Sequence, residues 1–123
     1  MIVKDSFLAK LRPAFNLNIY EVKIWTALLS RGPSTAGELA DISGVPRSRS
    51  YDVLETLEKK GFVIMKLGKP IKYLAIKPEE VIRRVNKNIK EHADNKLEKL
   101  EEVRGTKVFD ELKLLFDNGI NLV

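Results

Sequence analysis

The hydrophobic pattern of this chain changes its period at Gly61. After Gly61, two β-prone runs at 62–67 and 71–76 are separated only by Gly68-Lys69-Pro70, which predicts a hairpin. Before Gly61, apolar residues recur at the three- and four-residue spacing of amphipathic helices. That spacing predicts four successive helices, at about 5–12, 19–30, 36–43 and 46–60.

Two of these helices carry a local start signal. Asn18 is followed three residues later by Glu21, and Thr35 is followed in the same way by Glu38. In this capping box each side chain bonds a backbone N–H that the first helical turn leaves free. The helices over 19–30 and 36–43 are therefore expected to begin where these pairs stand.

Proline and glycine residues mark the other boundaries. Pro13 is expected to stop the first helix, and Gly44 to end the third. Pro46 suits the first turn of the fourth helix, since its missing N–H would have no partner there. We expect Trp25 and Met65 to belong to the core.

Two helices joined by a tight turn with glycine, and preceded by a third, form a helix-turn-helix, and a hairpin directly after them is a wing. The expected fold is mainly α with a small β-hairpin (α+β). A winged helix-turn-helix domain with an N-terminal helix is expected over 1–77, with its recognition helix at about 46–60 and its wing at 62–76. A helical dimerisation extension is expected over 78–123.

The extension is predicted to contain a long helix and a short last helix. Pro78, Glu79 and Glu80 favour a helix start, because proline tolerates the first turn and carboxylates suit the positive end of the helix dipole. Gly105-Thr106 should end this helix, and the last helix should stop near Asn118-Gly119.

An apolar stripe one residue wide runs along the length of the long helix, and the last helix has an apolar face of its own. The stripe is too narrow for a globular core and too apolar to stay in water, so it indicates pairing with another helix. We expect a homodimer, whose helices run either parallel or antiparallel. The expected interface residues are Ile82, Val85, Ile89, Ala93, Leu97, Leu100, Phe109, Leu112 and Phe116.

The positive charge is concentrated in one segment. The chain has 22 basic and 17 acidic residues, a net charge of +5, and residues 44–73 alone carry seven basic and three acidic side chains. A concentrated basic patch attracts a polyanion such as duplex DNA. The same patch could also be a solvated surface without a partner.

The residue inventory disfavours an enzyme. The chain has no cysteine and a single histidine, His92, which excludes thiolate metal sites, cysteine nucleophiles and paired-histidine motifs. Glycine-rich phosphate loops and carboxylate pairs beside a nucleophile are also absent from the sequence. We therefore expect no catalytic residue, no metal and no cofactor. No apolar run is long enough for a membrane span, so the expected location is the cytoplasm.

Residues Leu17 to Ile82 resemble the winged-helix domain of TrmB-like archaeal transcriptional regulators. The resemblance is carried by Gly32-Pro33-Ser34-Thr35-Ala36-Gly37-Glu38-Leu39-Ala40, by Ser43-Gly44-Val45-Pro46-Arg47-Ser48-Arg49-Ser50-Tyr51-Asp52-Val53-Leu54, by Leu57-Glu58-Lys59-Lys60-Gly61, and by the run from Gly68 to Tyr73 followed by Pro78-Glu79-Glu80. The family usually carries a large C-terminal sugar-binding domain, and this sequence stops about where that domain would begin. Sugar sensing is therefore not carried over.

The start of the helix at 46–60 is the predicted reading element. In a helix-turn-helix the first turn of the second helix reaches base edges in the major groove. Arg47 and Arg49 could each pair with guanine, and Ser48 could bond a base or a phosphate. Tyr51 either contacts a phosphate or packs at the edge of the core.

The tip of the wing is expected to contact the DNA backbone. Its basic residues are Lys66, Lys69 and Lys72. These charges could instead only protect the edge of a strand from aggregation.

The leading hypothesis is a sequence-specific regulator that binds double-stranded DNA as a dimer. One alternative is a winged-helix adaptor that binds a protein of the transcription machinery. Another is an architectural protein that coats DNA without sequence preference. Whether an effector exists, and which operator is bound, do not follow from the sequence.

Overall fold

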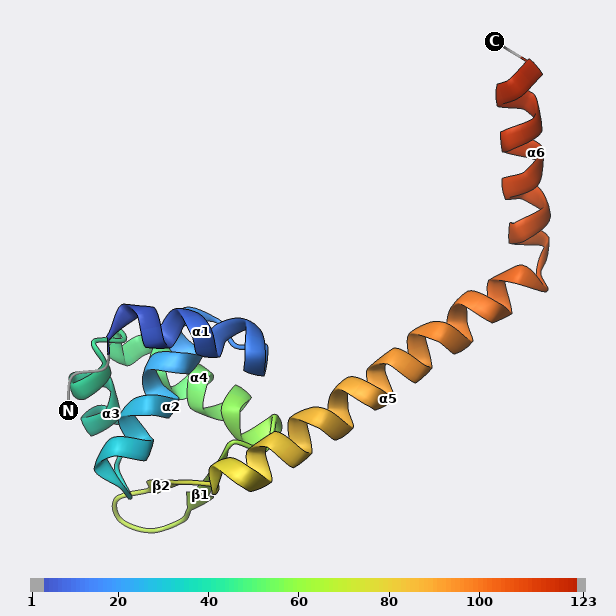
Figure 1. Ribbon diagram of the computed structural model, residues 1–123. Helices are drawn as coiled ribbons and strands as arrows, with labels where there is room; N and C mark the ends of the chain where they lie inside the picture. The colour runs from blue at the N-terminus through green and yellow to red at the C-terminus, as the bar shows by residue number, and fades with distance from the viewer. Residues whose placement is uncertain (1–3, 122–123) are drawn as a thin grey trace. The chain divides into compact units, whose positions relative to one another are not determined.

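The computed structural model describes residues 4–121 and divides the chain into two compact units, one ending at Val85 and the other beginning at Asn86 (Figure 1). The first contains six elements and the start of a seventh. They are α1 (Asp5–Phe15), α2 (Ile19–Arg31), α3 (Ala36–Ser43), α4 (Arg47–Lys59), β1 (Val63–Lys66), β2 (Lys72–Ala75) and the first turns of α5 (Pro78–Arg104). The order of elements confirms the predicted mainly α winged helix-turn-helix.

Both predicted capping boxes are present. The Glu21 backbone N–H donates to Asn18 Oδ1 over 2.8 Å, and Glu21 Oε1 accepts from the Asn18 backbone N–H over 2.9 Å. Thr35 and Glu38 make the same reciprocal pair over 3.2 Å in each direction. Because these bonds span three residues, the starts of α2 and α3 follow from local sequence alone.

The prediction that Pro13 ends α1 is wrong, since the helix continues through Pro13 to Phe15. The Phe15 ring packs edge-on against Trp25 and Phe62, with centroids 4.8 and 6.1 Å away. This packing holds the last helical turn although proline lacks a helical N–H. The helix then ends at Asn16, which takes the left-handed conformation with φ of 56°.

At the start of α4, Pro46 is the N-cap residue and lies just before the first helical position. Its carbonyl accepts from the backbone N–H groups of Arg49 and Ser50. The preceding turn closes at Gly44, whose φ of 74° lies in the left-handed region that glycine adopts most readily. The tight turn between α3 and α4 is therefore as the sequence predicted.

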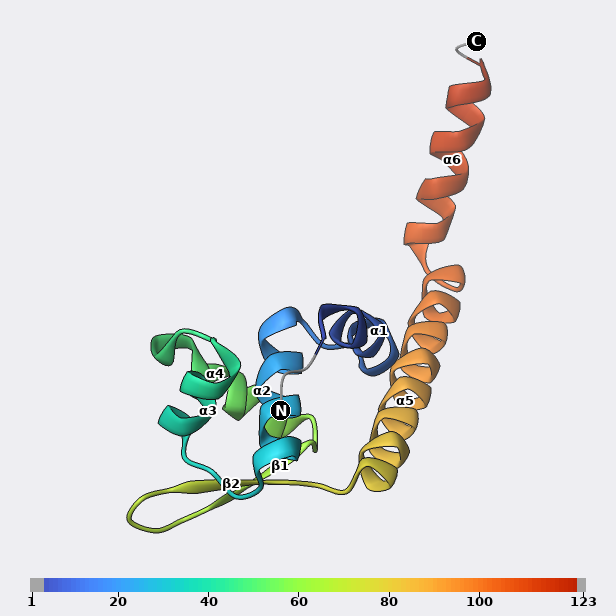
Figure 2. The same ribbon diagram turned by 60° about the vertical axis from the view of Figure 1, so that its left-hand side comes forward.

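The wing is a two-stranded antiparallel hairpin whose register pairs Val63 with Ala75 and Lys66 with Lys72. Both strands are shorter than the predicted runs, and Met65, expected in the core, is 39% exposed. Ser34 adds a bridge to Tyr73, which ties the segment before α3 to β2. The hairpin projects on the side of the unit away from α1 (Figures 1 and 2).

The core lies between the helices and the base of the hairpin. At its centre, the Trp25 and Phe62 rings meet edge to face at 5.1 Å, and both are almost completely buried. The largest other side chains that are fully buried are Ile24, Leu28, Leu39, Leu54, Leu57, Val22, Val63 and Val81.

The packed unit extends beyond residue 77, the predicted domain boundary. Val81 of α5 is fully buried and Val85 packs against the same core. The Arg84 guanidinium donates to the Gly61 carbonyl over 3.2 Å. Val85, which we expected only in a subunit interface, therefore also contributes to the winged-helix core. The division into functional regions at 77 stays a prediction.

The second unit consists of the rest of α5 and of α6 (Lys107–Asn121). The break between them falls at Gly105-Thr106, as predicted, whereas α6 continues past the predicted stop at Asn118-Gly119. The apolar residues of this unit are mostly exposed, by 56% at Ile89 and 67% at Leu100.

Candidate nucleic-acid interface

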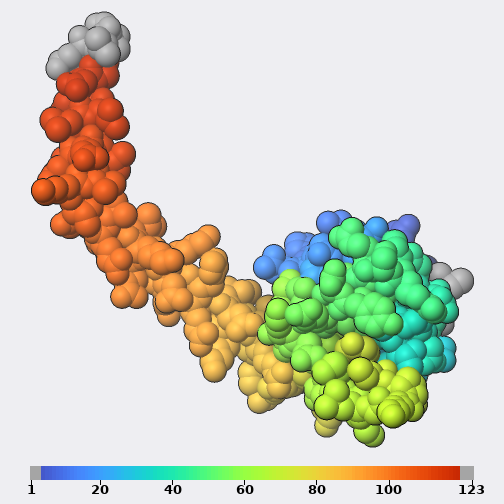
Figure 3. Space-filling view, turned by 180° about the vertical axis from the view of Figure 1, so that it is seen from behind, coloured from blue at the N-terminus to red at the C-terminus, as the bar shows by residue number. Residues whose placement is uncertain are grey.

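One surface of the first unit combines α3, α4 and the hairpin, which lie next to one another in Figure 3. α4 packs into the core through four residues, Ser50, Val53, Leu54 and Leu57. Its first turn contains no acidic residue and no side-chain cap, so no side chain of that turn offsets the positive end of the helix dipole. Such a helix start favours contact with an anion.

Helical geometry sets which α4 residues face away from the core. At 100° per residue, the direction opposite the four buried positions is occupied by Ser48, Asp52, Glu55 and Lys59. All four are exposed. Ser48 was predicted as a site residue, whereas Asp52 was not. The sequence pattern that could have identified Asp52 as a site residue is its spacing of four residues from Ser48, because this spacing places both on one helix face.

The two arginines at the start of α4 point to different neighbours. Arg47 Nη2 lies 3.9 Å from the Asp41 carboxylate, and its guanidinium covers Gly37 so closely that a Cβ there would lie 2.9 Å from it. The Arg49 guanidinium carbon lies 5.4 Å from the centre of the Tyr20 ring. Both side chains are exposed, and each is oriented by a contact that water or a ligand can replace.

A groove of about 460 Å³ connects the start of α3, the start of α4 and the wing. Tyr51 is 58% exposed and lines this groove, so it does not pack at the edge of the core. Burial raises the pKa of the Tyr73 phenol, which therefore stays neutral at physiological pH. The remaining lining residues are Thr35, Ala36, Gly37, Arg47, Pro70 and Ile71.

The wing carries its three predicted lysines on exposed positions. Lys66 and Lys72 stand directly opposite each other in the strand register, and Lys69 lies in the connecting loop. Like charges opposite each other destabilise a hairpin, and a polyanion relieves that repulsion. The structure thus brings the three lysines to one end of the hairpin.

Glu38 belongs to the framework that orients this surface. The Thr35 backbone N–H lowers the pKa of the Glu38 carboxyl, with further contributions from the Thr35 hydroxyl and the Arg31 guanidinium. Arg31 forms an ion pair with Glu38. These bonds hold the start of α3, which borders the groove.

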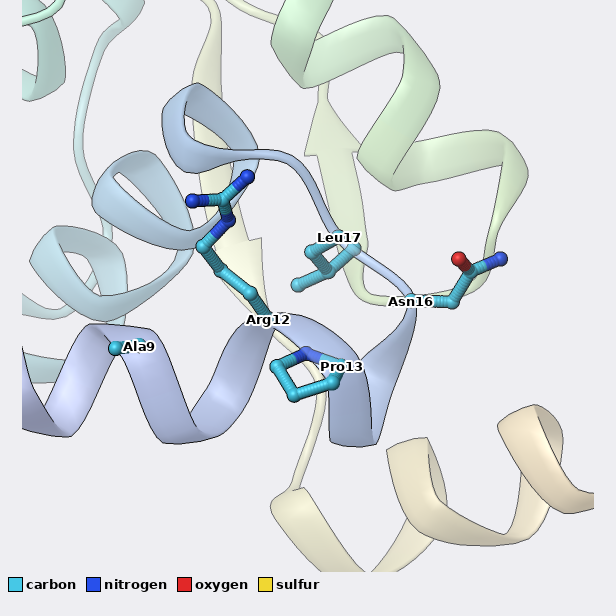
Figure 4. A pocket seen from close by; sticks show the side chains of 5 residues that line it. All are labelled: Ala9, Arg12, Pro13, Asn16 and Leu17. Carbon is cyan, nitrogen blue, oxygen red and sulfur yellow. The ribbon is translucent and has the colours of Figure 1, made fainter.

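A second, shallow pocket of about 380 Å³ lies on α1 and the turn after it (Figure 4). Its lining residues are Ala9, Arg12, Pro13, Asn16 and Leu17. Arg12 is the one charged residue among them, so this pocket has no acid-base pair. Across residues 4–121, no three His, Asp or Glu side chains gather as metal ligands would.

None of the helices in the described part of the chain is long and apolar enough to cross a bilayer.

The chain is similar to known transcriptional regulators. The model of the family described as "Sugar-specific transcriptional regulator TrmB" matches residues 11–79, more than half of the chain. The "DNA-binding HTH-type transcriptional repressor TrmBL2" of Thermococcus kodakarensis is 41% identical over 97 residues, which are 79% of this chain and 37% of that protein.

Solved structures give the same result. The structure titled "Structure of TrmBL2, an archaeal chromatin protein, shows a novel mode of DNA binding" matches with a TM-score of 0.79 and 34% identity, over 94% of this chain and 46% of that one. The transcriptional regulator Tm0710 of Thermotoga maritima matches with a TM-score of 0.52 and 24% identity over 94% of this chain and 85% of its own, which shows a shared fold. This chain spans less than half of the length of either TrmBL2 relative. The family match, the similar relatives and the shared fold together show that the chain belongs to the TrmB family of winged-helix transcriptional regulators.

Proposed function

We propose that this protein is a sequence-specific regulator, not an enzyme, that binds double-stranded DNA as a homodimer in the cytoplasm. The observation that carries the proposal is the shared surface of α4 and the wing (Figure 3). The first turn of α4 offers Arg47, Ser48 and Arg49 and contains no acidic residue of its own, and the wing offers three lysines. A helix enters the major groove while flanking cations hold the phosphates.

In this proposal the first turn of α4 reads bases. Arg47 and Arg49 have the fork of donors that pairs with guanine, and Ser48 lies on the outermost face between them. Tyr51 contacts a phosphate from the groove. Lys66, Lys69 and Lys72 hold the flanking backbone and contribute affinity that does not depend on sequence.

In this proposal the dimer forms through the apolar faces of α5 and α6. Ile82, Leu97 and Leu100 of α5 are exposed by 56 to 67%, and Leu112 and Phe116 of α6 by 51 and 68%. A monomer rarely leaves an apolar face of this length in water. Two copies paired through residues 78–116 would present their α4 helices to half-sites about 34 Å apart on a near-palindromic site.

A second candidate function is an architectural DNA-binding protein without sequence preference. It is favoured by one specific observation, the description of the relative TrmBL2 as a chromatin protein. Both functions use the same basic surface. Only the ratio of specific to random affinity distinguishes them.

The test is a fluorescence-anisotropy titration at several salt concentrations. It compares the affinity of the protein for a duplex of about 30 base pairs from upstream of its own gene with its affinity for a scrambled duplex of equal composition. We expect tighter binding to the upstream duplex that persists near physiological salt. Equal and steeply salt-dependent binding to both duplexes would favour the architectural function. If neither duplex binds, the surface serves another partner, such as a protein of the transcription machinery.

A further inference from the structure

The hairpin exposes large apolar side chains as well as lysines. Four of them are exposed by 39 to 76%, and they are Ile64, Met65, Leu67 and Ile71. Leu67 is the most exposed of the large apolar side chains in the part of the chain that the structure describes. Single apolar residues are common on protein surfaces, whereas four of them within one short hairpin form a patch and favour a binding role.

The strand register indicates which way Leu67 faces. The last pair of the register joins Lys66 and Lys72, so continuing it by one residue places Leu67 opposite Ile71. Opposite side chains of an antiparallel pair lie on the same face of the hairpin. Ile71 lines the groove that also contains Tyr51 of α4. Leu67 therefore extends this face toward the loop of the hairpin, which protrudes from the first unit (Figure 2).

The surroundings of Leu67 are positively charged. Lys66 precedes it, Lys69 and Lys72 follow it, and no acidic residue occurs from Lys59 to Pro78. A second copy of the chain would bring the same lysines to the patch and be repelled by them. In the minor groove of DNA, by contrast, phosphates on either side can pair with the lysines, and an apolar side chain can enter between two base pairs.

We propose that Leu67 is an apolar wedge that enters the minor groove beside the segment bound by α4, partly unstacks one base step and bends the duplex. Wedges of this kind kink DNA by about 20–90° toward the major groove. Pyrimidine–purine steps such as TA and CA unstack most easily, so Leu67 should favour such a step at the edge of the bound site. The proposal rests on the DNA binding proposed above, whether regulatory or architectural, and adds a deformation of the duplex to it.

The test measures DNA bending by resonance energy transfer between dyes at the two ends of the upstream duplex. The protein concentration is one that saturates this duplex in the anisotropy titration. The unmodified protein should raise the transfer efficiency, because a bend brings the two ends closer together. Leu67→Ala should lose most of that rise. Its loss of affinity should stay below about tenfold, and its salt slope should not change, because the substitution removes no charge.

Two further variants serve as controls. Ile64→Ala removes another exposed apolar side chain from the hairpin. Because Ile64 is three residues from Leu67, strand alternation places it on the opposite face, and its removal should leave the bend unchanged. Leu67→Phe keeps a large apolar side chain and should retain the bend, which separates loss of the wedge from damage to the hairpin. Thermal melts by circular dichroism check that all three variants fold.

An unchanged bend in Leu67→Ala at saturation would overturn the proposal, as would DNA binding by the unmodified protein without any bend. Both outcomes leave the proposed DNA binding intact. Absence of binding to either duplex in the anisotropy titration would overturn the proposed function, and the wedge with it. An unchanged bend together with a lower mass of Leu67→Ala in light scattering would assign the patch to a second copy of the chain and also overturn the proposal.

Discussion

The Lys60 ammonium lies 2.9 Å from the Glu21 carboxylate, whose side chain is only 4% exposed. Lys60 is the C-cap residue of α4, and Glu21 belongs to the capping box of α2, so this ion pair connects the end of α4 to the start of α2. The other Glu21 oxygen accepts from the Asn18 backbone N–H. The pair thus helps to hold the orientation of α4 on the domain.

The two partners of this ion pair should differ in their effect on stability. Lys60→Met leaves a buried carboxylate without its countercharge and should lower the free energy of unfolding by about 2–3 kcal/mol. Glu21→Gln should cost about 1 kcal/mol, because the Lys60 side chain is 35% exposed and water can solvate it. Urea denaturation measures both. Lys59→Met is the control, since its pair with Glu55 is exposed. Equal losses for the two variants of the pair would contradict this asymmetry.

Arg49 and Lys69 should contribute to DNA affinity in different ways. Arg49→Ala should cost about 1–3 kcal/mol on the specific duplex and relax the preference at one base pair. Its contact with the Tyr20 ring is worth only about 0.5–1 kcal/mol, so Arg49 can leave it for a base. Lys69→Ala should weaken binding to all duplexes alike and reduce the salt slope by about one unit.

Anisotropy titrations of both variants on single-base-pair substituted duplexes check this contrast. An equal loss on specific and random DNA from Arg49→Ala would mean that this residue contacts only phosphate.

Asp52 should lower the affinity of the protein for DNA that lacks the specific site. Its carboxylate is exposed on the face of α4 directed away from the core, where phosphates repel it unless it accepts from a base amino group such as cytosine N4. Asp52→Asn should therefore strengthen binding to random DNA and lower the ratio of specific to random affinity, by up to about 1–3 kcal/mol. Asp94→Asn removes the same charge from the second unit and serves as control. If Asp52→Asn strengthens binding to both duplexes equally, Asp52 is only repulsive.

Gly37 should matter for DNA binding more than for folding. A Cβ at Gly37 would lie 2.9 Å from the flexible end of Arg47, so Gly37→Ala displaces that guanidinium without disturbing backbone. Alanine in a helix is about 0.5–1 kcal/mol more favourable than glycine, so stability should not fall. DNA affinity should fall by up to about tenfold. Gly119→Ala makes the same change in α6, where nothing lies within 4 Å. Unchanged affinity in Gly37→Ala would mean that Arg47 leaves this orientation on binding.

Stability should decline at acid pH partly through Glu38. Folding lowers the pKa of its carboxyl below the ordinary value of 4.5, first through the Thr35 backbone N–H. A group with a lowered pKa stabilises the fold above its unfolded pKa, and that contribution is lost as the pH falls through the folded pKa.

Glu38→Gln should therefore lessen the drop in melting temperature between about pH 5 and pH 3. Circular dichroism at both pH values measures it, with Glu98→Gln of the exposed α5 surface as control. A drop equal to that of the unmodified protein would exclude Glu38 as a contributor.

Local sequence determined where the helices of the first unit begin and where the hydrophobic pattern changes from the period of a helix to that of a strand. The capping boxes at Asn18 and Thr35 span three residues, and the turn at Gly44 needs only its own backbone freedom. For the same reason the hairpin after Gly61 and the helix break at Gly105 could be predicted. These signals depend on neighbours in the chain, so no knowledge of the fold is required to see them.

Only the tertiary structure decided what packs against what. α1 continues past Pro13 because the Phe15 ring packs on Trp25 and Phe62, residues distant in sequence. Val81 is buried because the first turns of α5 pack against the core of the first unit.

The surface features followed from the same packing. The orientation of the α4 arginines depends on Asp41, Gly37 and Tyr20, which belong to two other helices. The outward position of Asp52 depends on which face of α4 the core buries. Sequence patterns specify bonds within a few residues, whereas these features depend on contacts between residues far apart in the chain, which form only when the helices pack together.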